Sequence, residues 1–367
     1  MIPRFLNIEN KQLQPFAEMW MGTHKGAPSQ VYDNNSGNCA LLDICGELPF
    51  LFKLIAIDKP LSIQAHPGKK QAEEGFAREE ESGLSIDSPV RNYKDSNHKP
   101  EIICAITPIE LMAGFCEPEK ILKSFIELSS ISAALKDLVD PLTDALKKDS
   151  LPVFFRALFN FSEFEKEYLC SCINDKETGN KNVISDEQWK LMKKFTSLYP
   201  GDSAVLSPLY LNYMTIQPGQ AVFIPAGILH AYISGFGVEL MTSSDNVLRG
   251  GLTPKHVDVG ELMNILNFKP FSARIISPSS LKNWFYYDTP CEEYALAYMR
   301  ADGEAFFSGN CPAICIITEG EMMTEGMSFK KGDSFFLAQR SEPCVFKGNF
   351  SLYAACSAGA VNRAKTN

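Results

Sequence analysis

The sequence predicts a mainly β fold that is interrupted by a helical insert. Three observations support this prediction. Residues 1–116 and 200–275 contain short apolar runs separated by Gly-, Pro- and Asn-containing turns, a pattern typical of strands. Between residues 117 and 199 the spacing of the apolar residues changes to that of helices. Residues 276–367 return to strand-like runs with Gly-containing turns, which suggests a second small barrel or sandwich.

The composition argues against several classes of function. The 367 residues carry a net charge of −9, which makes the chain a poor candidate for binding nucleic acid or an anionic membrane. A few local cations can still hold a phosphate. No apolar run is long enough to cross a bilayer. The 11 cysteines are scattered, form no CxxC motif and follow no signal peptide, so we expect a cytoplasmic protein with reduced thiols. We also expect a monomer.

The first candidate site residues lie in an apolar run that ends at Pro67 and Gly68. If this run is a strand, residues two apart share a face, so Gln64 and His66 point to the same side. An amide oxygen and an imidazole directed at one point can begin a metal site. A single buried His is more often an ordinary core residue, so the site needs further ligands.

His230 closes the segment Gly-x5-Pro-x-Gly-x2-His, which runs from Gly219 to His230. This spacing is that of the second cupin motif. Turns at Pro218-Gly219 and at 225–227 flank an apolar strand, and we predict a hairpin that presents His230 inward.

Glu101 is the remaining candidate ligand, because it precedes an apolar run and lies two residues after Lys99. Together with Gln64, His66 and His230 it would offer one amide, one carboxylate and two imidazoles, with no thiolate. This donor set suits Zn²⁺, with Mn²⁺, Fe²⁺ and Co²⁺ as alternatives. The simpler alternative is that Glu101 only forms an ion pair with Lys99.

A second group of candidate residues lies in a Gly-containing loop near residue 250. Arg249 and Lys255 flank Gly250 and Gly251, where the backbone can approach a ligand closely. Two cations and several N–H groups on such a loop could hold a phosphate. The alternative is a solvated loop with ordinary surface charges.

Taken together, these motifs resemble the type I phosphomannose isomerases. The resemblance covers roughly residues 16–260 and rests on Glu18–Gly22, Leu48–Lys53, Leu61–Pro67, Asn97–Glu101, Pro225–Tyr232 and Ser244–Lys255. It implies an enzyme with one zinc ion per chain that interconverts mannose 6-phosphate and fructose 6-phosphate, and we expect an enediol intermediate. It also implies two cupin-like barrels and an all-α domain.

The resemblance further implies a role for each matching residue and a division into domains. The expected zinc ligands are Gln64, His66, Glu101 and His230; the expected catalytic residue is Arg249; the expected substrate contacts are Ser62, Lys99, Glu239 and Lys255. For the proton-transferring base, Glu239, Lys99 and a zinc-bound water stay open. The expected domains are a catalytic cupin domain (1–116 and 200–275), a helical insert (117–199) and a C-terminal cupin-like domain (276–367). No His follows His256, so the last of these holds no His-based metal site.

Two other functions stay open. One is a cupin Fe²⁺ oxygenase, although such enzymes more often present His-x-His than the Gln-x-His found here. The other is a sugar-phosphate sensor without catalysis, which would be expected to have lost a metal ligand or Arg249, whereas this chain keeps them all.

Overall fold

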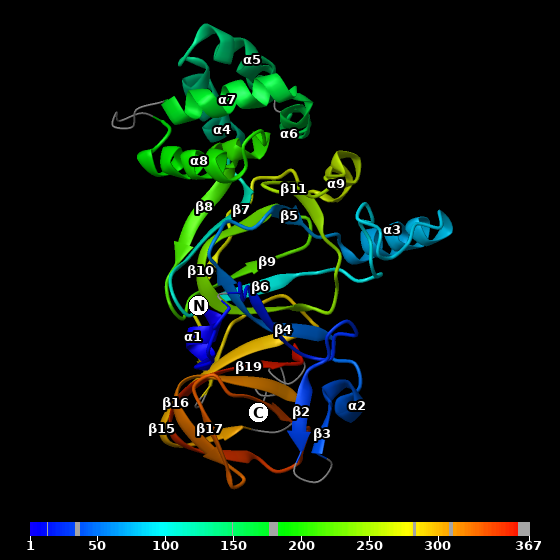
Figure 1. Cartoon of the computed structure of the whole chain (residues 1–367), viewed down its shortest axis with the longest axis vertical. Helices are drawn as coiled ribbons and strands as arrows, with labels where there is room; N and C mark the ends of the chain where they lie inside the picture. The colour runs from blue at the N-terminus through cyan, green and yellow to red at the C-terminus, as the bar shows by residue number, and fades with distance from the viewer. Residues whose placement is uncertain are drawn as a thin grey trace.

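The structure, a computed structural model, describes residues 1–12, 14–33, 37–148, 150–175, 183–281, 284–307 and 311–358. These residues form a mainly β fold with several helices, as the sequence predicted. Figure 1 shows three parts along the long axis: a group of helices from residues 118–198, a middle sheet, and a C-terminal sheet at the other end.

The middle sheet has ten strands, which come from both sides of the helical region in the sequence. They are β1 (Glu18–Met21), β4 (Phe50–Ile57), β5 (Ile63–Ala65), β6 (Glu101–Ala105), β7 (Ile109–Phe115), β8 (Leu211–Ile216), β9 (Ala221–Ile224), β10 (His230–Thr242), β11 (Leu248–Gly251) and β12 (Ile275–Ile276).

The long strand β10 joins the two halves of this sheet. Its first residues pair with β5 and β7, and its later residues pair with β4 and β6. The change of partner falls at Gly235, whose φ of 121° is accessible to glycine but not to ordinary side chains. Apolar residues from both halves meet in one buried cluster, which includes Ile55, Ile103, Leu111 and Ile224. The two halves therefore face each other across a shared interior.

The hairpin predicted for His230 is wrong. β9 pairs with β6 and β12 but not with β10, because the turn at 225–227 carries the chain into the other half of the sheet; β6 lies between the two strands. The N–H of Gly227 donates to the main-chain oxygen of His66 at 2.8 Å, which fixes this crossing. His230 is held instead between Gln64 of β5 and Ala113 of β7.

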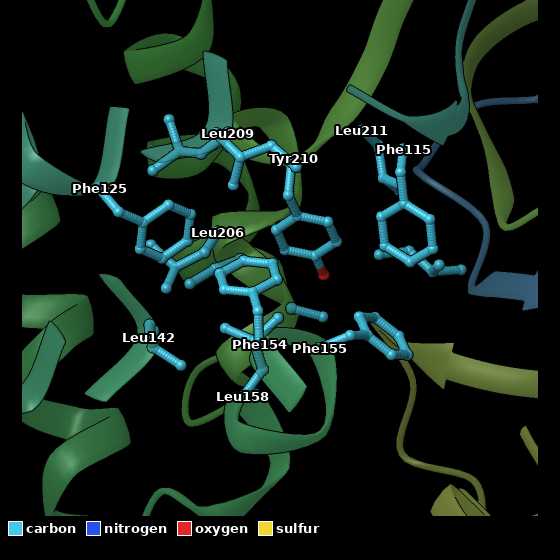
Figure 2. Packing of buried hydrophobic residues seen from close by; sticks show 14 of the residues in the cluster. Phe115, Phe125, Leu142, Phe154, Phe155, Leu158, Leu206, Leu209, Tyr210 and Leu211 are labelled. Carbon is cyan, nitrogen blue, oxygen red and sulfur yellow. The ribbon is translucent and has the colours of Figure 1, made fainter. Parts of the chain in front are cut away.

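The helical region packs on the outer face of β5, β7 and β11. Its elements are α4 (Pro118–Ser129), α5 (Ala133–Lys147), α6 (Leu151–Ala157), η1 (Leu158–Asn160), α7 (Glu163–Asp175), α8 (Asp186–Leu198) and η2 (Ser203–Leu209). Figure 2 shows aromatic rings of this region in close contact, with Phe125 edge-on to Phe154 at 5.0 Å between centroids. Phe115 of β7 joins the same cluster, so the helices and the sheet share one core.

The C-terminal sheet packs on the opposite outer face of the middle sheet. Its core is shared with that sheet, since Leu54, Ile102 and Val238 cluster with Ile316 and Tyr353. The strands are β13 (Ser279–Leu281), β14 (Trp284–Tyr286), β15 (Ala295–Phe307), β16 (Ala313–Thr324), β17 (Met327–Lys330), β18 (Ser334–Leu337) and β19 (Cys344–Cys356). The remaining elements are α1 (Ile2–Leu6), β2 (Gln30–Asp33), β3 (Gly37–Ala40), α2 (Leu41–Cys45), α3 (Lys69–Glu81) and α9 (Val259–Ile265).

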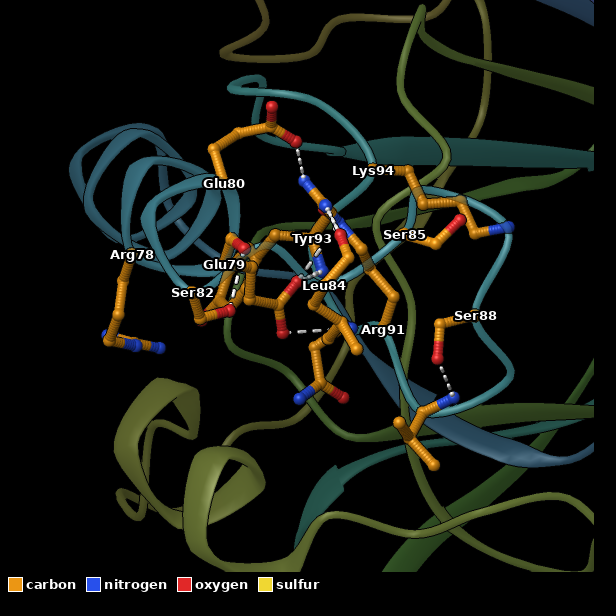
Figure 3. Close-up of polar contacts among 12 residues, drawn as sticks. Arg78, Glu79, Glu80, Ser82, Leu84, Ser85, Ser88, Arg91, Tyr93 and Lys94 are labelled. Atoms are coloured by element: carbon orange, nitrogen blue, oxygen red, sulfur yellow. Dashed lines mark hydrogen bonds and ion pairs between the residues drawn. The ribbon is translucent and has the colours of Figure 1, made fainter.

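The charged stretch after Gly68 is partly buried, although charged residues are usually exposed. Helix α3 is present, but the loop that follows it folds back and buries Arg91 and Tyr93. Figure 3 shows Arg91 among the carboxylates of Glu79 and Glu80. The Glu79 carboxylate also accepts the N–H groups of residues 92 and 93, at 3.1 and 2.8 Å. The buried guanidinium of Arg91 is therefore paired with carboxylates and does not require solvent.

Within the described residues, no helix has the length and apolar character needed to cross a membrane.

We predict that Gly75→Ala destabilises the protein. In an open helical position this change would stabilise by about 1 kcal/mol. Here the new methyl carbon would lie 2.4 Å from ring atoms of the buried Tyr93, so α3 and the loop must separate. We expect the free energy of unfolding, measured by chemical denaturation, to fall by about 1–3 kcal/mol.

The matched control for this prediction is Gly260→Ala in α9. There the nearest atom would lie 3.5 Å from the new carbon, which is an ordinary contact. This substitution should be neutral or should stabilise the protein by up to about 1 kcal/mol. If the two substitutions proved equally mild, the described packing of Tyr93 against α3 would be wrong.

Candidate metal centre

Three potential metal ligands converge at the ends of strands in the middle sheet. His66 directly follows β5, Glu101 begins β6 and His230 begins β10. One ligand atom from each of these side chains lies within 4.8 Å of the others, and all three residues are at most 1% exposed. The cluster therefore has the size and the burial of a metal site.

Strand alternation explains why Glu101 points into the interior. Residues two apart on a strand share a face, and Ile103 and Ala105 of β6 both belong to the interior apolar cluster. Glu101 extends this inward row by one position. Ile102 and Cys104 point the other way, into the core shared with the C-terminal sheet.

The two imidazoles present the same nitrogen to the carboxylate of Glu101. His66 Nε2 lies 3.2 Å from Oε1, and His230 Nε2 lies 3.3 Å from Oε2. Each Nδ1 faces a main-chain carbonyl, that of Asn246 at 2.6 Å and that of Ile228 at 2.9 Å. Since a carbonyl only accepts, each Nδ1 carries the hydrogen, and in a neutral ring Nε2 then has a free lone pair.

These lone pairs have no hydrogen-bond partner. Both Nε2 atoms are buried, and no described residue donates to either of them. Burial lowers the pKa of His66 to about 4, and the positive charge of Lys99 contributes to this shift. The His66 ring is therefore neutral near pH 7. A lone pair that faces a carboxylate is unfavourable, and a bound cation would relieve both groups. The site therefore fits a divalent metal ion with nitrogen and oxygen ligands.

Lys99 keeps Glu101 ionised. Burial alone would raise the pKa of this carboxyl group. The ammonium of Lys99, 3.0 Å from Oε1, is the largest influence in the opposite direction, and the pKa lies well below its usual range. Glu101 therefore contributes a full negative charge to the cluster and pairs with Lys99 at the same time.

Gln64 and Arg249 occupy the same row of the sheet as His230. Gln64 is directly opposite His230 on one side and opposite Arg249 of β11 on the other. Side chains of directly opposed residues project from the same face, so all three project from the inner face of the sheet. Arg249 is half-buried, and burial lowers the pKa of its guanidinium; no described carboxylate pairs with it.

Glu239 lies in a buried ion pair behind the cluster. Its carboxylate is 3.1 Å from the ammonium of Lys53 on the neighbouring strand β4, and Glu18 lies 3.5 Å from the same ammonium. Burial opposes the charge of Lys53, but these two carboxylates outweigh it and raise its pKa. The hydroxyl of Tyr232 donates to Glu101 at 3.4 Å, between the ion pair and the cluster.

The last two predicted site residues are less buried. Ser62 is half-buried two residues before Gln64, which places it on the same side of the chain. Lys255 is exposed in the segment after β11, where its N–H donates to the hydroxyl of Thr253 at 3.1 Å. The structure does not bring Lys255 into contact with the metal cluster.

A pocket of about 610 Å³ lies close to Lys255 but apart from the cluster. It is lined by Tyr199, Asp202 and other residues of the helical region, and by Thr253 and Pro254. None of the predicted metal ligands lines it.

Sequence reasoning missed three residues that the structure places around the cluster: Lys53, Tyr232 and Asn246. Lys53 stands alone in the otherwise apolar run of β4, and such a buried lysine needs a carboxylate partner, which was a usable signal. Tyr232 shares a strand face with His230, which was a second signal. The role of Asn246 depends on pairing with a distant loop, so the local sequence held no signal for it.

Comparison with known proteins adds independent observations. A family model described as the catalytic domain of type I phosphomannose isomerase matches residues 3–117. Mannose-6-phosphate isomerase from Escherichia coli (strain K12) is 33% identical over 371 residues, which covers 94% of this chain and 92% of the relative. The Homo sapiens enzyme of the same name is 31% identical over 321 residues, which covers 79% of this chain and 74% of the relative.

Solved structures of proteins with these names also superpose on this chain. A mutant of phosphomannose isomerase from Salmonella typhimurium superposes with a TM-score of 0.85 at 31% identity, covering 97% of this chain and 94% of that one. A zinc-bound mannose 6-phosphate isomerase superposes with a TM-score of 0.85 at 30% identity, covering 97% of this chain and 95% of that one.

We predict that removal of bound metal lowers the melting temperature. Without a cation, the two buried Nε2 atoms lose their partner beside the carboxylate. If zinc is supplied at about 100 times its Kd, the holoprotein gains about 2.7 kcal/mol over the apoprotein. Scanning calorimetry before and after dialysis against EDTA measures this difference, and added zinc should restore the original value. His230→Ala should show no response to EDTA; an equal response in this variant would place the metal elsewhere.

Proposed function

Because the chain belongs to the type I phosphomannose isomerase family, we propose that it is a zinc-dependent enzyme that interconverts mannose 6-phosphate and fructose 6-phosphate through an enediol intermediate. It is a sugar-phosphate isomerase, as its relatives are. The observation that carries the zinc proposal is the buried cluster of His66, Glu101 and His230 with two unpartnered Nε2 atoms.

One zinc ion per chain would be held by Gln64, His66, Glu101 and His230. The two imidazoles and the carboxylate lie close together in the structure. Gln64 is the fourth proposed ligand, because it lies directly opposite His230 in the sheet. The absence of thiolate from this set suits a catalytic rather than a structural zinc ion. When bound, zinc supplies positive charge that stabilises negative charge developing on the sugar oxygens.

Arg249 is the proposed catalytic residue. The isomerisation moves a proton between C1 and C2, and negative charge develops on the adjacent oxygens of the enediol. Arg249 projects from the same inner face as Gln64 and His230, and no described carboxylate neutralises it. A fixed and partly desolvated guanidinium can stabilise such charge without reorganising during the reaction.

Glu239 is the better of the two protein candidates for the base. Lys99 forms an ion pair with Glu101, and an ammonium has donors but no acceptor. Glu239 is a carboxylate whose burial raises its pKa, although Lys53 opposes this shift. A carboxylate with a raised pKa is closer to the range that suits a general base near neutral pH. We place Lys99 at the substrate pocket as a hydrogen-bond donor.

Lys255 and Ser62 are the proposed contacts for the remaining substrate atoms, with the phosphate at Lys255. Lys255 is exposed and forms no ion pair with the described residues, so its ammonium is available to an anion. A phosphate contact at the distal end of the sugar would hold the substrate in the site without touching the reacting carbons.

Several broader predictions are kept as parts of this proposal. We propose a catalytic cupin domain of residues 1–116 and 200–275, an insert domain of residues 117–199, and a C-terminal cupin-like domain of residues 276–367. The separate middle and C-terminal sheets, and the position of the helices beyond the middle sheet in Figure 1, support this division. We also propose a cytoplasmic monomer; light scattering would test the oligomeric state.

We predict that His230 and Arg249 can be separated by their effects on metal content. His230→Ala should lose zinc and activity together. Arg249→Ala should keep its zinc, because it removes charge but no ligand, while kcat falls by about 100-fold or more. Metal analysis of the purified variants and an assay coupled to mannose 6-phosphate conversion measure both quantities.

Two outcomes of these measurements would count against the proposed function. An Arg249→Ala enzyme with near-normal turnover would remove Arg249 from the reaction. A wild-type protein that holds iron and consumes oxygen without isomerising mannose 6-phosphate would favour the oxygenase alternative, and one that binds the sugar phosphate without turnover would favour the sensor.

We predict that Lys255→Ala raises KM for mannose 6-phosphate by about tenfold and leaves kcat within about twofold. A distant phosphate contact acts on the bound substrate and on the transition state alike, so its loss weakens binding without slowing the chemical step. Steady-state kinetics measure both constants. Lys269→Ala, another loop lysine, serves as the control and should leave both constants unchanged. A fall in kcat alone would show that Lys255 contacts the reacting end of the sugar.

A further inference from the structure

Asn246 is fully buried between β10 and β11, and its side chain uses all of its hydrogen-bonding capacity. Its Oδ1 accepts the N–H groups of Lys94 and Asp95, at 2.7 and 3.2 Å. Its Nδ2 donates to the main-chain oxygens of Asp95 and Asn97, at 2.8 and 2.9 Å. A single amide therefore fastens the segment 94–97 to the segment 243–247.

The main-chain oxygen of Asn246 has a separate role. It accepts the Nδ1–H of His66 at 2.6 Å, and this hydrogen bond leaves Nε2 as the free nitrogen that faces Glu101. The direction of the His66 ring thus depends on where this carbonyl lies. The carbonyl is held in place by the side chain of the same residue.

The segment 94–97 reaches the metal cluster by a second route. It leads within two residues to Lys99 and within four to Glu101. Asp95 strengthens the connection, since its carboxylate accepts the hydroxyl of Ser244 and the N–H of Asp245, both at 2.8 Å. Hydrogen bonds therefore connect Asn246 to both parts of the cluster, to His66 directly and to the Lys99–Glu101 pair through the segment 94–97.

The segment is itself anchored from the other side. The main-chain oxygen of Tyr93 accepts from the guanidinium of Arg91 at 2.7 Å, and the Glu79 carboxylate accepts the N–H of Tyr93 (Figure 3). Residue 94, whose N–H reaches Asn246, follows directly. The Asn246 amide therefore connects the segment 243–247 to a segment that has a second anchor of its own.

We infer that Asn246 is a positioning residue for the metal centre: its buried amide fixes the carbonyl that orients His66 and ties it to the segment that carries Lys99 and Glu101. The inference rests on the zinc site proposed above. Partners that orient a metal-bound His typically change metal affinity by 10- to 100-fold when they are removed. Asn246 acts through His66 and need not contact the metal or the substrate.

The test compares Asn246→Ala with wild type by zinc affinity rather than by activity. Competition with a chromophoric chelator gives the Kd for zinc, and we expect it to rise by 10- to 100-fold. The visible spectrum of the Co²⁺-substituted protein reports the ligand geometry, and we expect its bands to shift. A role limited to general stability would lower the melting temperature of the apoprotein and move neither quantity.

Asn212→Ala is the matched control. The Asn212 amide also donates to three carbonyls, those of Gly114, Phe115 and Phe271, at 3.3, 3.0 and 2.9 Å. It contacts none of the proposed zinc ligands. Its loss should therefore lower the melting temperature to a similar extent and leave the Kd for zinc within about threefold of wild type.

A zinc Kd for Asn246→Ala within the range of the control would overturn the inference. If Asn246→Ala fails to fold, Asn246→Ser replaces it, since its hydroxyl adds no charge and can satisfy part of the hydrogen bonding; we expect a smaller loss of zinc affinity, and an unchanged affinity would be equally decisive. A wild-type protein without zinc affinity would instead remove the proposed function itself, so the two failures are distinguishable.

Discussion

The ionised carboxylate of Glu101 is the constraint on which the candidate site depends. It is buried at the centre of the protein, where an unpaired negative charge is strongly unfavourable. Lys99 neutralises one side of it, and two imidazoles approach from the other with lone pairs that no hydrogen satisfies. Two of these three neighbours can satisfy the carboxylate only through a further cation. The same arrangement that is costly without a metal is therefore favourable with one.

Much of the site could be predicted from the sequence because its signals are local. The two-residue spacing of Gln64 and His66, and the position of Glu101 before an apolar run, are properties of single strands. The partners of these strands are not local. The prediction of a hairpin before His230 failed because the turn at 225–227 is compatible with either a hairpin or a crossing, and tertiary packing selects the crossing.

The charged stretch around residue 90 shows a second limit of sequence reasoning. Charged residues are usually exposed, so composition alone favours a solvated loop in this stretch. The structure buries Arg91 because Glu79, Glu80 and main-chain carbonyls together satisfy its guanidinium, and none of these partners can be inferred from composition. The same reasoning applies to Asn246, whose partners lie about 150 residues earlier in the chain. Internal satisfaction of polar groups depends on the fold, and the fold brings these segments together.

The helical region and the C-terminal sheet cover the two outer faces of the middle sheet, and these two covers explain why the polar site residues point inward. Ile63, Ala65 and Leu248 lie in the core shared with the helical region. Because side chains alternate along a strand, the burial of these three on the outer face directs Gln64 and Arg249 to the inner face. On the other half of the sheet, the C-terminal sheet buries Leu54 and Ile102 in the same way, which directs Lys53 and Glu101 inward. A one-residue slip in either half would expose apolar residues to the interior site and place charges in an apolar core. The register of the site is thus enforced by the two covers, although neither contributes any of the predicted metal ligands.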